Sequence, residues 1–335
     1  MTTHQENAPR SLIVAPAWVG DMVMAHTLIR LLAQAGHQID VAAPGATAPV
    51  ARRMAEVSQV HVVDFKHGEL GLGKRRAVGH GLRAQNYDHA YVLPNSWKSA
   101  LMPWFANIPQ RTGWSGEARF GLLNDRRTLD KERYPLMIDR FMALADPAGQ
   151  LPEEPPLPKL SPDTERVAAL RAEFQLPTTS LVGLCPGAEY GAAKKWPNEH
   201  WAGLASALQA QNYQVLLFGS PNDEPEGTAI AAAVPDVINL IGRTRLEDAV
   251  DLLSACDRVV CNDSGLMHVA CALDVPTVGI FGSTSPQFTP PLGPLAQVAE
   301  IQLDCRPCFE RVCPLGHLNC LRQLSVDSVL AKISA

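Results

Sequence analysis

The chain has 335 residues, a length that suits two α/β domains of ordinary size. Hydrophobic residues make up 46% of it and charged residues 19%, a balance typical of a globular protein with a substantial core. The formal net charge of −5 excludes a general affinity for nucleic acid, so any basic surface must be local.

Short apolar runs alternate with segments of helical periodicity in the first half of the chain. This alternation is typical of βαβ units that build a parallel sheet. In chain order, we expect a strand at 11–16, a helix at 22–35, and strands at 39–43, 60–63 and 89–93.

The alternation stops at 151–162, where a stiff, proline-rich composition is typical of a connector. A second series of strands and helices follows, so we expect two Rossmann-like domains, at 1–158 and 159–335. Whether the C-terminal helix packs back on the first domain stays open. The second series has strands at 181–185, 214–219, 258–261 and 276–281, and helices at 198–211, 246–255 and 264–272.

Ligands of open α/β sheets bind at the carboxyl ends of strands, and three loops in such positions carry suitable residues. The first, at 17–21, ends in Gly20 and Asp21, where a glycine permits a tight turn and a carboxylate caps a helix. It lacks the pattern G-x-G-x-x-G of a dinucleotide site. From the residues alone, helix capping is the interpretation favoured for Asp21.

The second loop, at 186–197, combines glycines such as Gly187 with the adjacent lysines Lys194 and Lys195. This combination suits a phosphate group, because backbone N–H groups can approach it while an ammonium group neutralises its charge. A solvated surface turn would explain the same residues, and both interpretations stay open.

The third loop, at 261–268, follows a strand and opens a helix. Asp263 ends the strand, and Ser264 and Gly265 begin the helix, whose free N–H groups form an anion site suited to a diphosphate. His268 lies one turn further along the same face. A capped helix with a histidine in the core is the alternative.

Five segments together match one known family. They are Val-Gly-Asp-Met-Val-Met-Ala at 19–25, Pro-Gly-Ala-Glu-Tyr-Gly at 186–191, Lys-Lys-Trp-Pro at 194–197, Asn-Asp-Ser-Gly-Leu-Met-His-Val-Ala at 262–270 and Phe-Gly-Ser-Thr-Ser-Pro-Gln-Phe-Thr-Pro-Pro at 281–291. The chain resembles the ADP-heptose:lipopolysaccharide heptosyltransferases, and within them the heptosyltransferase II group. The resemblance covers nearly the whole chain and is specific through the combination of segments.

This resemblance implies a GT-B fold, in which two Rossmann-like domains with parallel sheets face a central cleft. It also implies an inverting transfer that requires no metal ion or other cofactor. The implied donor is ADP-heptose, and the implied acceptor is the first heptose of the lipopolysaccharide inner core, carried on heptosyl-Kdo2-lipid A. The first domain would bind the acceptor and the second the donor.

The resemblance also implies roles for single residues. Asp21 would be the base that takes the acceptor hydroxyl proton, and Lys194 would stabilise charge on the leaving diphosphate. Glu224 would bind the ribose, with Asp223 as a close competitor. The other donor-binding residues that we expect are Gly187, Lys195, Thr244, Asp263, Ser264, Gly265 and His268.

An anionic, lipid-linked acceptor requires positive charge on the first domain, and basic residues cluster there, although such clusters are often only a solvated face. We expect acceptor binding by Lys74, Arg75, Arg76, Lys98 and Arg119, within a basic region that also includes Lys66, Arg83, Arg111, Arg126 and Arg127. Such a surface would also favour peripheral contact with the inner membrane.

The N-terminus lacks the apolar core of a signal peptide, and apolar runs stay shorter than the roughly 20 residues that span a bilayer. We therefore expect a cytoplasmic protein whose eight cysteines stay reduced. Four of them, Cys305, Cys308, Cys313 and Cys320, are close enough in sequence for a structural zinc site. Free thiols are the alternative.

Three other functions stay open on the sequence alone. Heptosyltransferases I and III act on neighbouring acceptors of the inner core. A nucleotide-sugar epimerase on the same fold would use the donor pocket without an acceptor. A non-catalytic nucleotide-binding protein would not need Asp21.

Overall fold

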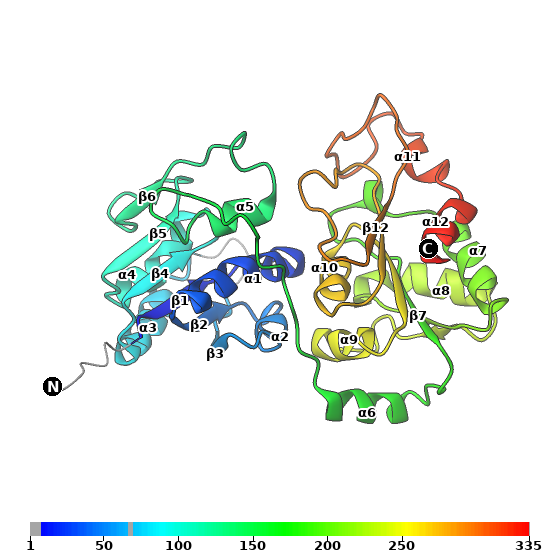
Figure 1. Ribbon diagram of the computed structural model, residues 1–335, viewed down its shortest axis with the longest axis horizontal. Coiled ribbons are helices and arrows are strands. Elements are labelled where there is room, and N and C mark those ends of the chain that lie inside the picture. Colours follow the sequence, from blue (N-terminus) through cyan, green and yellow to red (C-terminus); the bar gives the residue numbers. More distant parts are fainter. Residues whose placement is uncertain (1–7, 66–69, 335) are drawn as a thin grey trace. The chain divides into compact units, whose positions relative to one another are not determined.

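The computed structural model describes residues 8–65 and 70–334, so Lys66 of the predicted basic region lies outside the described residues. The chain divides into two compact units, residues 1–158 and 159–335. Each unit contains one six-stranded parallel sheet with helices packed against it (Figure 1). The predicted α/β class with two parallel sheets is confirmed.

The sheet of the first unit has the strand order β3-β2-β1-β4-β5-β6. Its central strand β1 is almost wholly buried, because helical crossovers cover both faces of a parallel sheet. The strands are β1 (Arg10–Val14), β2 (Gln38–Ala43), β3 (Val57–Val62), β4 (His89–Val92), β5 (Gln110–Trp114) and β6 (Asp125–Arg127). The helices are α1 (Val19–Gln34), α2 (Ala48–Ala51), α3 (Leu72–Leu82), α4 (Leu101–Phe105) and α5 (Met137–Met142), with short 3-10 turns η1 (Arg83–Gln85) and η2 (Trp97–Ala100).

The sheet of the second unit has the order β12-β11-β10-β7-β8-β9. The strands are β7 (Leu181–Cys185), β8 (Gln214–Leu217), β9 (Ile238–Asn239), β10 (Arg258–Asn262), β11 (Thr277–Ile280) and β12 (Ala296–Ala299). The helices are α6 (Thr164–Glu173), α7 (Asn198–Gln209), α8 (Glu224–Ala233), α9 (Leu246–Leu253), α10 (Gly265–Ala272), α11 (Asn319–Arg322) and α12 (Val326–Ser334), with 3-10 turns η3 (Ala192–Lys194) and η4 (Pro221–Asp223).

Both sheets follow the same topology. In each, the strand that comes first in sequence lies at the middle, beside the strand that comes fourth. The order reverses between β1 and β4 in the first unit and between β7 and β10 in the second. A crevice for ligands opens at the carboxyl ends of strands at such a reversal. The loops that follow β1, β7 and β10 are therefore the places where chemistry is expected.

The core of the second unit is built around two tryptophans. The rings of Trp196 and Trp201 meet edge to face at 5.1 Å, and both are fully buried. Val329 and Ile333 of α12 belong to the same core. The apolar face of α12 is thus used within the second unit.

Every strand expected from the sequence overlaps an observed one, and β7 has the predicted bounds. Several strands were missed because their sequences lack a continuous apolar run: β5 and β6 are rich in polar residues, and β9 has two residues. Among the described residues, no helix has the length and apolar character needed to cross a membrane.

Candidate active site

Lys194 and Asp263 form the centre of a polar cluster in the second unit. Lys194 ends η3, and its Nζ lies 2.6 Å from Oδ2 of Asp263 and 3.2 Å from the Asp263 carbonyl oxygen. Thr284 donates its hydroxyl to the same Oδ2 at 2.5 Å. The side chains of Lys194 and Asp263 are only 14% and 4% exposed, so this ion pair is largely withdrawn from water.

Asn262 joins the loop after β7 to the end of β10. Its side-chain nitrogen donates to the Pro186 carbonyl at 2.6 Å, and its side-chain oxygen accepts from the backbone N–H of Trp196 at 3.2 Å. The Asn262 side chain is completely buried. A buried amide with both ends bonded fixes the two loops against each other, and the lysine loop is therefore held beside the start of α10.

Helix α10 begins directly after this cluster. Ser264 is its N-cap, but the Ser264 side chain makes no capping hydrogen bond. Its hydroxyl lies 3.5 Å from the sulfur of Cys261 instead. The first N–H groups of a helix carry partial positive charge, so the turn at Ser264 and Gly265 offers donors to an anion next to the Lys194 ammonium group.

His268 lies one turn into α10 and is almost completely buried. Burial lowers the pKa of His268 to about 4; the neighbouring Asp263 raises it and Lys194 lowers it. The imidazole is therefore neutral at pH 7, and its buried Nδ1 has no hydrogen-bond partner. A neutral ring next to an anion site can donate or accept a hydrogen bond without adding charge.

The ammonium group of Lys195 contacts two carboxylates, neither of which is Asp263. Its Nζ lies 2.8 Å from Glu226 and 3.4 Å from Asp223. Burial lowers the pKa of Lys195, but these two carboxylates outweigh it, and the net shift is upward. Gly187 lies against Asp223 so closely that a β-carbon there would be 2.3 Å from the carboxyl group. Only glycine fits at this position.

The two ribose candidates differ in their surroundings. Asp223 is buried and accepts hydrogen bonds from the backbone N–H and the hydroxyl of Ser220, at 3.0 and 2.8 Å. Glu224, the first residue of α8, is exposed. Its carboxylate lies beside Gly242, which has φ +71°, and the partly buried Thr244 follows in the same loop. Asp223 is thus committed to its own loop, whereas the carboxylate of Glu224 faces solvent.

In the first unit, Asp21 lies in the first turn of α1, immediately after the central strand β1. Trp18 is the N-cap, so Asp21 is the third residue of the helix and not its cap. Asp21 is partly exposed. The positive end of the helix favours the charged form of a carboxylate at this position.

Most of the predicted acceptor-binding arginines are used inside the first unit, which corrects the expectation that they present free charge. Arg119 is fully buried and donates to the carbonyls of Pro94 and Trp114. Arg75 is also buried, donates to the carbonyls of Leu70 and Lys98 and lies over a phenylalanine ring. Composition did not reveal this, because a guanidinium group can be buried when carbonyl oxygens accept its hydrogens.

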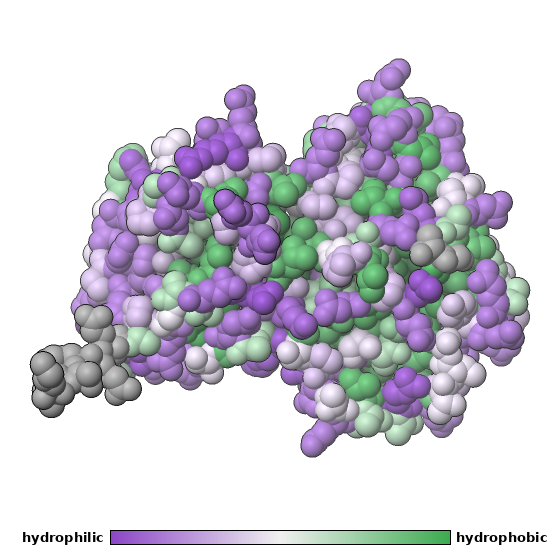
Figure 2. All heavy atoms as spheres, viewed as in Figure 1, coloured by the Kyte–Doolittle hydropathy of each residue, from purple (hydrophilic) through white to green (hydrophobic). Residues whose placement is uncertain are grey.

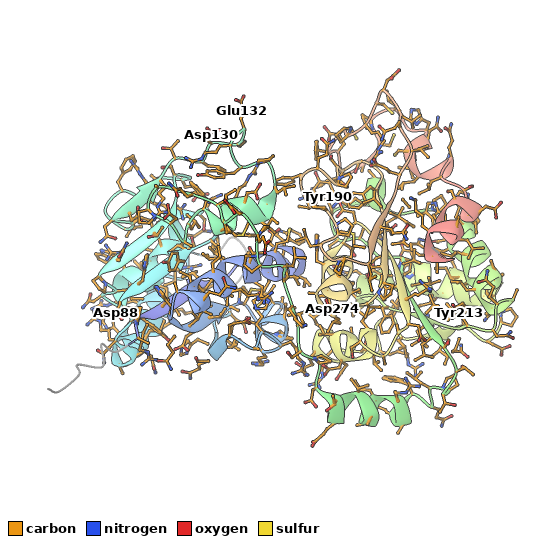
Figure 3. All side chains as sticks on the ribbon, viewed as in Figure 1. Asp88, Asp130, Glu132, Tyr190, Tyr213 and Asp274 are labelled. Carbon is orange, nitrogen blue, oxygen red and sulfur yellow. The ribbon has the colours of Figure 1, made fainter. Side chains whose placement is uncertain are left out.

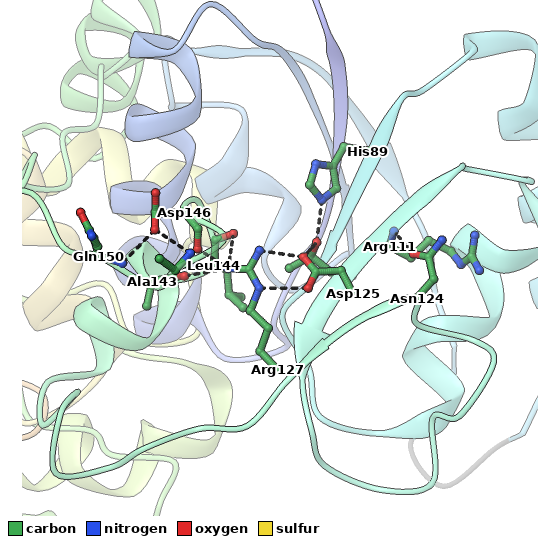
Figure 4. Close-up of polar contacts among 11 residues, drawn as sticks. His89, Arg111, Asn124, Asp125, Arg127, Ala143, Leu144, Asp146 and Gln150 are labelled. Atoms are coloured by element: carbon green, nitrogen blue, oxygen red, sulfur yellow. Dashed lines mark hydrogen bonds and ion pairs between the residues drawn. The ribbon is translucent and has the colours of Figure 1, made fainter.

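Arg127, whose contacts Figure 4 shows, and Arg111 are also bound within the first unit. Arg127 pairs with both carboxylate oxygens of Asp125 and donates to the carbonyls that follow α5. Arg111 donates to the carbonyls of Leu122 and Ile108. The remaining basic candidates are two exposed side chains on α3 and one partly exposed side chain in η2, namely Lys74, Arg76 and Lys98.

The four C-terminal cysteines line one pocket together with Ser283 and His317. Cys320 is buried and the other three are partly exposed. No group of three or more His, Cys, Asp or Glu side chains is arranged to hold a metal ion in the ranges 8–65 and 70–334.

The family of the chain follows from a comparison with known proteins. The model of glycosyltransferase family 9 (heptosyltransferase) matches residues 75–319. This chain belongs to that family.

Curated relatives agree with the family. Lipopolysaccharide heptosyltransferase 2 of Salmonella typhimurium is 48% identical, with 87% of each chain covered. The enzyme of the same name from Escherichia coli K12 is 47% identical over 97% of each chain. The chain is therefore a glycosyltransferase of family 9.

Solved structures agree as well. The E. coli ADP-heptose lipopolysaccharide heptosyltransferase II matches with a TM-score of 0.87 at 42% identity, covering 97% of each chain. A family 9 member from Veillonella parvula matches with a TM-score of 0.86 at 19% identity, which shows the fold alone. The fold of this family 9 member is the GT-B fold that the sequence predicted.

Two residues of this family 9 site had no role in the sequence prediction. Asn262 and Thr284 both lie within the matching segments, but nothing in their spacing shows what they touch. Their partners, Pro186, Trp196 and Asp263, follow other strands of the sheet. A polar residue directly at the end of a buried strand is the signal that could have identified Asn262.

Proposed function

We propose that this chain transfers heptose from ADP-heptose to the first heptose of the lipopolysaccharide inner core. Relatives named heptosyltransferase 2 from Salmonella, E. coli and Haemophilus are 44–48% identical, whereas relatives named heptosyltransferase 1 are 26 and 29% identical. This difference favours the second heptose over the first. The observation that carries the proposal is the buried pair of Lys194 and Asp263 at the start of α10.

The second unit, 159–335, is proposed to bind the donor. A diphosphate placed at the first turn of α10 would accept backbone hydrogen bonds from Ser264 and Gly265 and would face the ammonium group of Lys194. Asp263 holds that ammonium group in a fixed position, and the Thr284 hydroxyl donates to the same carboxylate oxygen. Preorganised positive charge stabilises the leaving group as its bond to the sugar breaks.

Around this diphosphate, the other donor residues have distinct roles. Glu224 is proposed to bind the ribose hydroxyls, because its carboxylate is exposed beside the loop that contains Thr244. Lys195 neutralises Asp223 and Glu226 and thereby supports the loop after β8. His268 lines the site as a neutral side chain.

The first unit, 1–158, is proposed to bind the acceptor and supply the base. In an inverting transfer, the acceptor hydroxyl oxygen attacks the anomeric carbon from the face opposite the diphosphate. The new C–O bond forms while the bond to the diphosphate breaks, and ADP leaves with the electron pair. The hydroxyl proton passes to the carboxylate of Asp21, whose position in the first turn of α1, the helix that follows the central strand β1, suits this role.

Lys74, Arg76 and Lys98 are proposed to bind the negative charges of the acceptor. The buried Arg75 links α3 to η2, because it donates to the carbonyl oxygens of Leu70 and Lys98. On α3, Leu72 is 48% exposed beside these charges. Exposed apolar and basic side chains on one helix favour peripheral contact with an anionic membrane surface, which we place on the cytoplasmic side of the inner membrane.

The reaction itself is proposed to need no cofactor, because Lys194 and the start of α10 supply the positive charge that a metal ion would otherwise contribute.

The decisive experiment supplies the purified protein with ADP-heptose and defined inner-core acceptors and measures product masses. We expect one added heptose on the acceptor that carries a single heptose, and none on the acceptor that lacks it. Transfer to the acceptor without heptose would instead identify a heptosyltransferase I. Conversion of the donor in the absence of any acceptor would identify an epimerase.

A further inference from the structure

The positive charge of the two lysines in the loop after β7 is offset by carboxylates. Lys194 pairs with Asp263 at 2.6 Å. Lys195 pairs with Glu226 at 2.8 Å and with Asp223 at 3.4 Å. Two ammonium groups thus face three carboxylates. A diphosphate is negatively charged when it binds and gains further negative charge as its bond to the sugar breaks, so a further cation would stabilise it.

Tyr190 lies in the loop between β7 and η3 (Figure 3) and contacts two cations. The Nζ of Lys194 lies 5.0 Å from the centroid of the Tyr190 ring, and the guanidinium carbon of Arg311 lies 5.3 Å from the same centroid. Both distances are those of cation–π contacts. The Tyr190 hydroxyl donates to the carbonyl of Phe309, which fixes the ring against the segment that contains Arg311. The two positive charges therefore lie at the same aromatic ring.

The backbone of Arg311 is also bound to the lysine loop. Its carbonyl oxygen accepts a hydrogen bond at 3.0 Å from the N–H of Ala193, the residue directly before Lys194. Gly191 approaches the same oxygen so closely that a β-carbon there would collide with it. The side chain of Arg311, in contrast, is exposed. The loop that contains Lys194 therefore fixes the position of Arg311 and leaves its guanidinium group able to move.

Arg311 differs from its basic neighbour Arg306 in having no carboxylate partner. The ion pairs among residues 8–65 and 70–334 do not include Arg311. The largely buried Arg306 pairs with Glu300 at 2.8 Å and donates to backbone carbonyls. The charge of an unpaired guanidinium group is not offset, and such a group can donate to two phosphate oxygens at once.

We propose that Arg311 is a donor-binding residue that contacts the diphosphate of the nucleotide sugar together with Lys194. This role rests on the proposed transfer of heptose. The cation–π contact with Tyr190 holds the guanidinium group near Lys194 before the donor arrives, and the exposed side chain then turns to donate to phosphate oxygens. Arg311 thereby supplies positive charge that the carboxylates beside the two lysines offset, and it stabilises the leaving ADP.

Titration calorimetry with ADP tests this role in the full-length protein. Arg311→Gln removes the charge and keeps a polar side chain, so ADP affinity should fall about tenfold while the melting temperature stays the same. Arg311→Lys retains the charge and should keep more of the affinity. Arg258→Gln is the matched control and should bind ADP like the wild type, since Arg258 begins β10 and thus lies at the opposite edge of the sheet from the donor loops.

Three results would overturn the role of Arg311: wild-type affinity in Arg311→Gln, an equal loss in both Arg311 variants, or a loss that accompanies a lower melting temperature. A heptose-transfer assay on the same proteins distinguishes this failure from failure of the proposed function. If the wild type transfers heptose and Arg311→Gln binds ADP normally, only the role of Arg311 is wrong. If the wild type neither binds ADP nor transfers heptose, the proposed function is wrong, and so is the role of Arg311.

Discussion

The ammonium nitrogen of Lys194 lies 2.6 Å from the carboxylate of Asp263, although 69 residues separate them in sequence. The pair joins the loop that follows β7 to the residue that follows β10, on the two strands between which the sheet order reverses. A lysine held in this way has lost its side-chain freedom before any ligand arrives, so its positive charge is already in position.

Replacement of this lysine should therefore affect both binding and chemistry. We expect Lys194→Ala to weaken ADP affinity and to cost about 2–4 kcal/mol in transition-state stabilisation. Titration calorimetry with ADP and the rate of heptose transfer measure the two effects. Lys159→Ala, which removes an exposed lysine paired with Asp274, should leave both unchanged. If Lys194→Ala keeps wild-type affinity and turnover, the diphosphate is bound elsewhere.

The carboxylate of Asp21 should be needed for turnover and not for the donor. Asp21→Asn keeps the size of the side chain but cannot accept the acceptor proton, so turnover should collapse while ADP affinity stays the same. The control is Glu132→Gln, since Glu132 is exposed on the loop between β6 and α5 (Figure 3). This loop is strongly hydrophilic in Figure 2. Near-normal turnover of Asp21→Asn would leave Asp21 a purely structural role.

Variants of the two candidate ribose ligands, Glu224 and Asp223, should differ in their effects on ADP affinity and on melting temperature. Glu224→Gln should weaken ADP by about 1–2 kcal/mol without lowering the melting temperature, since the side chain is exposed. Asp223→Asn should lower the melting temperature, because its carboxylate holds Ser220 and Lys195. Comparing ADP with 2′-deoxy-ADP sharpens the test: the wild type should prefer ADP, and Glu224→Gln should lose that preference. An equal preference in both proteins argues against Glu224 as the ribose ligand.

His268 should make the folded state sensitive to acid. Its pKa is lowered by burial to about 4, whereas a histidine in the unfolded chain titrates near 6.5. Between these values the unfolded chain binds a proton that the folded chain does not, so stability falls as pH drops through this window and is unaffected above it. The loss is at most about 3 kcal/mol.

Denaturant unfolding at pH 7 and pH 5 measures this effect. In His268→Gln, the free energy of unfolding should depend less on pH between these two values than in the wild type. Its dependence on pH above 7 should be unchanged. An identical slope in the variant would show that another group is responsible for the loss of stability, such as His89, whose pKa burial also lowers to about 4.

Chelation should not stop catalysis. Lys194 and the start of α10 carry the charge of the leaving diphosphate, so the initial rate of transfer should hold in EDTA. Any structural zinc at the cysteines would be lost slowly, with a falling melting temperature and a matching decline in rate. Rapid loss of turnover in protein that stays folded, restored by Mg²⁺ or Mn²⁺, would disprove the metal-independent mechanism.

The sequence predicted the fold and the positions of the loops after β7 and β10 well, because both depend on local patterns; the roles of the residues in these loops stay predictions. β7 is a run of five apolar or small residues between Ser180 and Pro186, and α10 begins where Ser264 and Gly265 follow a strand. The contacts of individual side chains could not be predicted from these local sequence patterns. Arg119 was interpreted as an exposed charge, yet its partners Pro94 and Trp114 come from separate loops that only the folded unit brings together.

The two units have the same strand order, but they can complete their folds at different stages of synthesis. Every strand of the first sheet lies within residues 10–127, so the growing chain can complete that sheet before β7 is made. The second unit cannot close so early, since Val329 and Ile333 of α12 fill its core beside Trp201. Apolar surface on α7 therefore stays uncovered until the helix at 326–334 has left the ribosome. During that time the second unit is more prone to misfolding than the first.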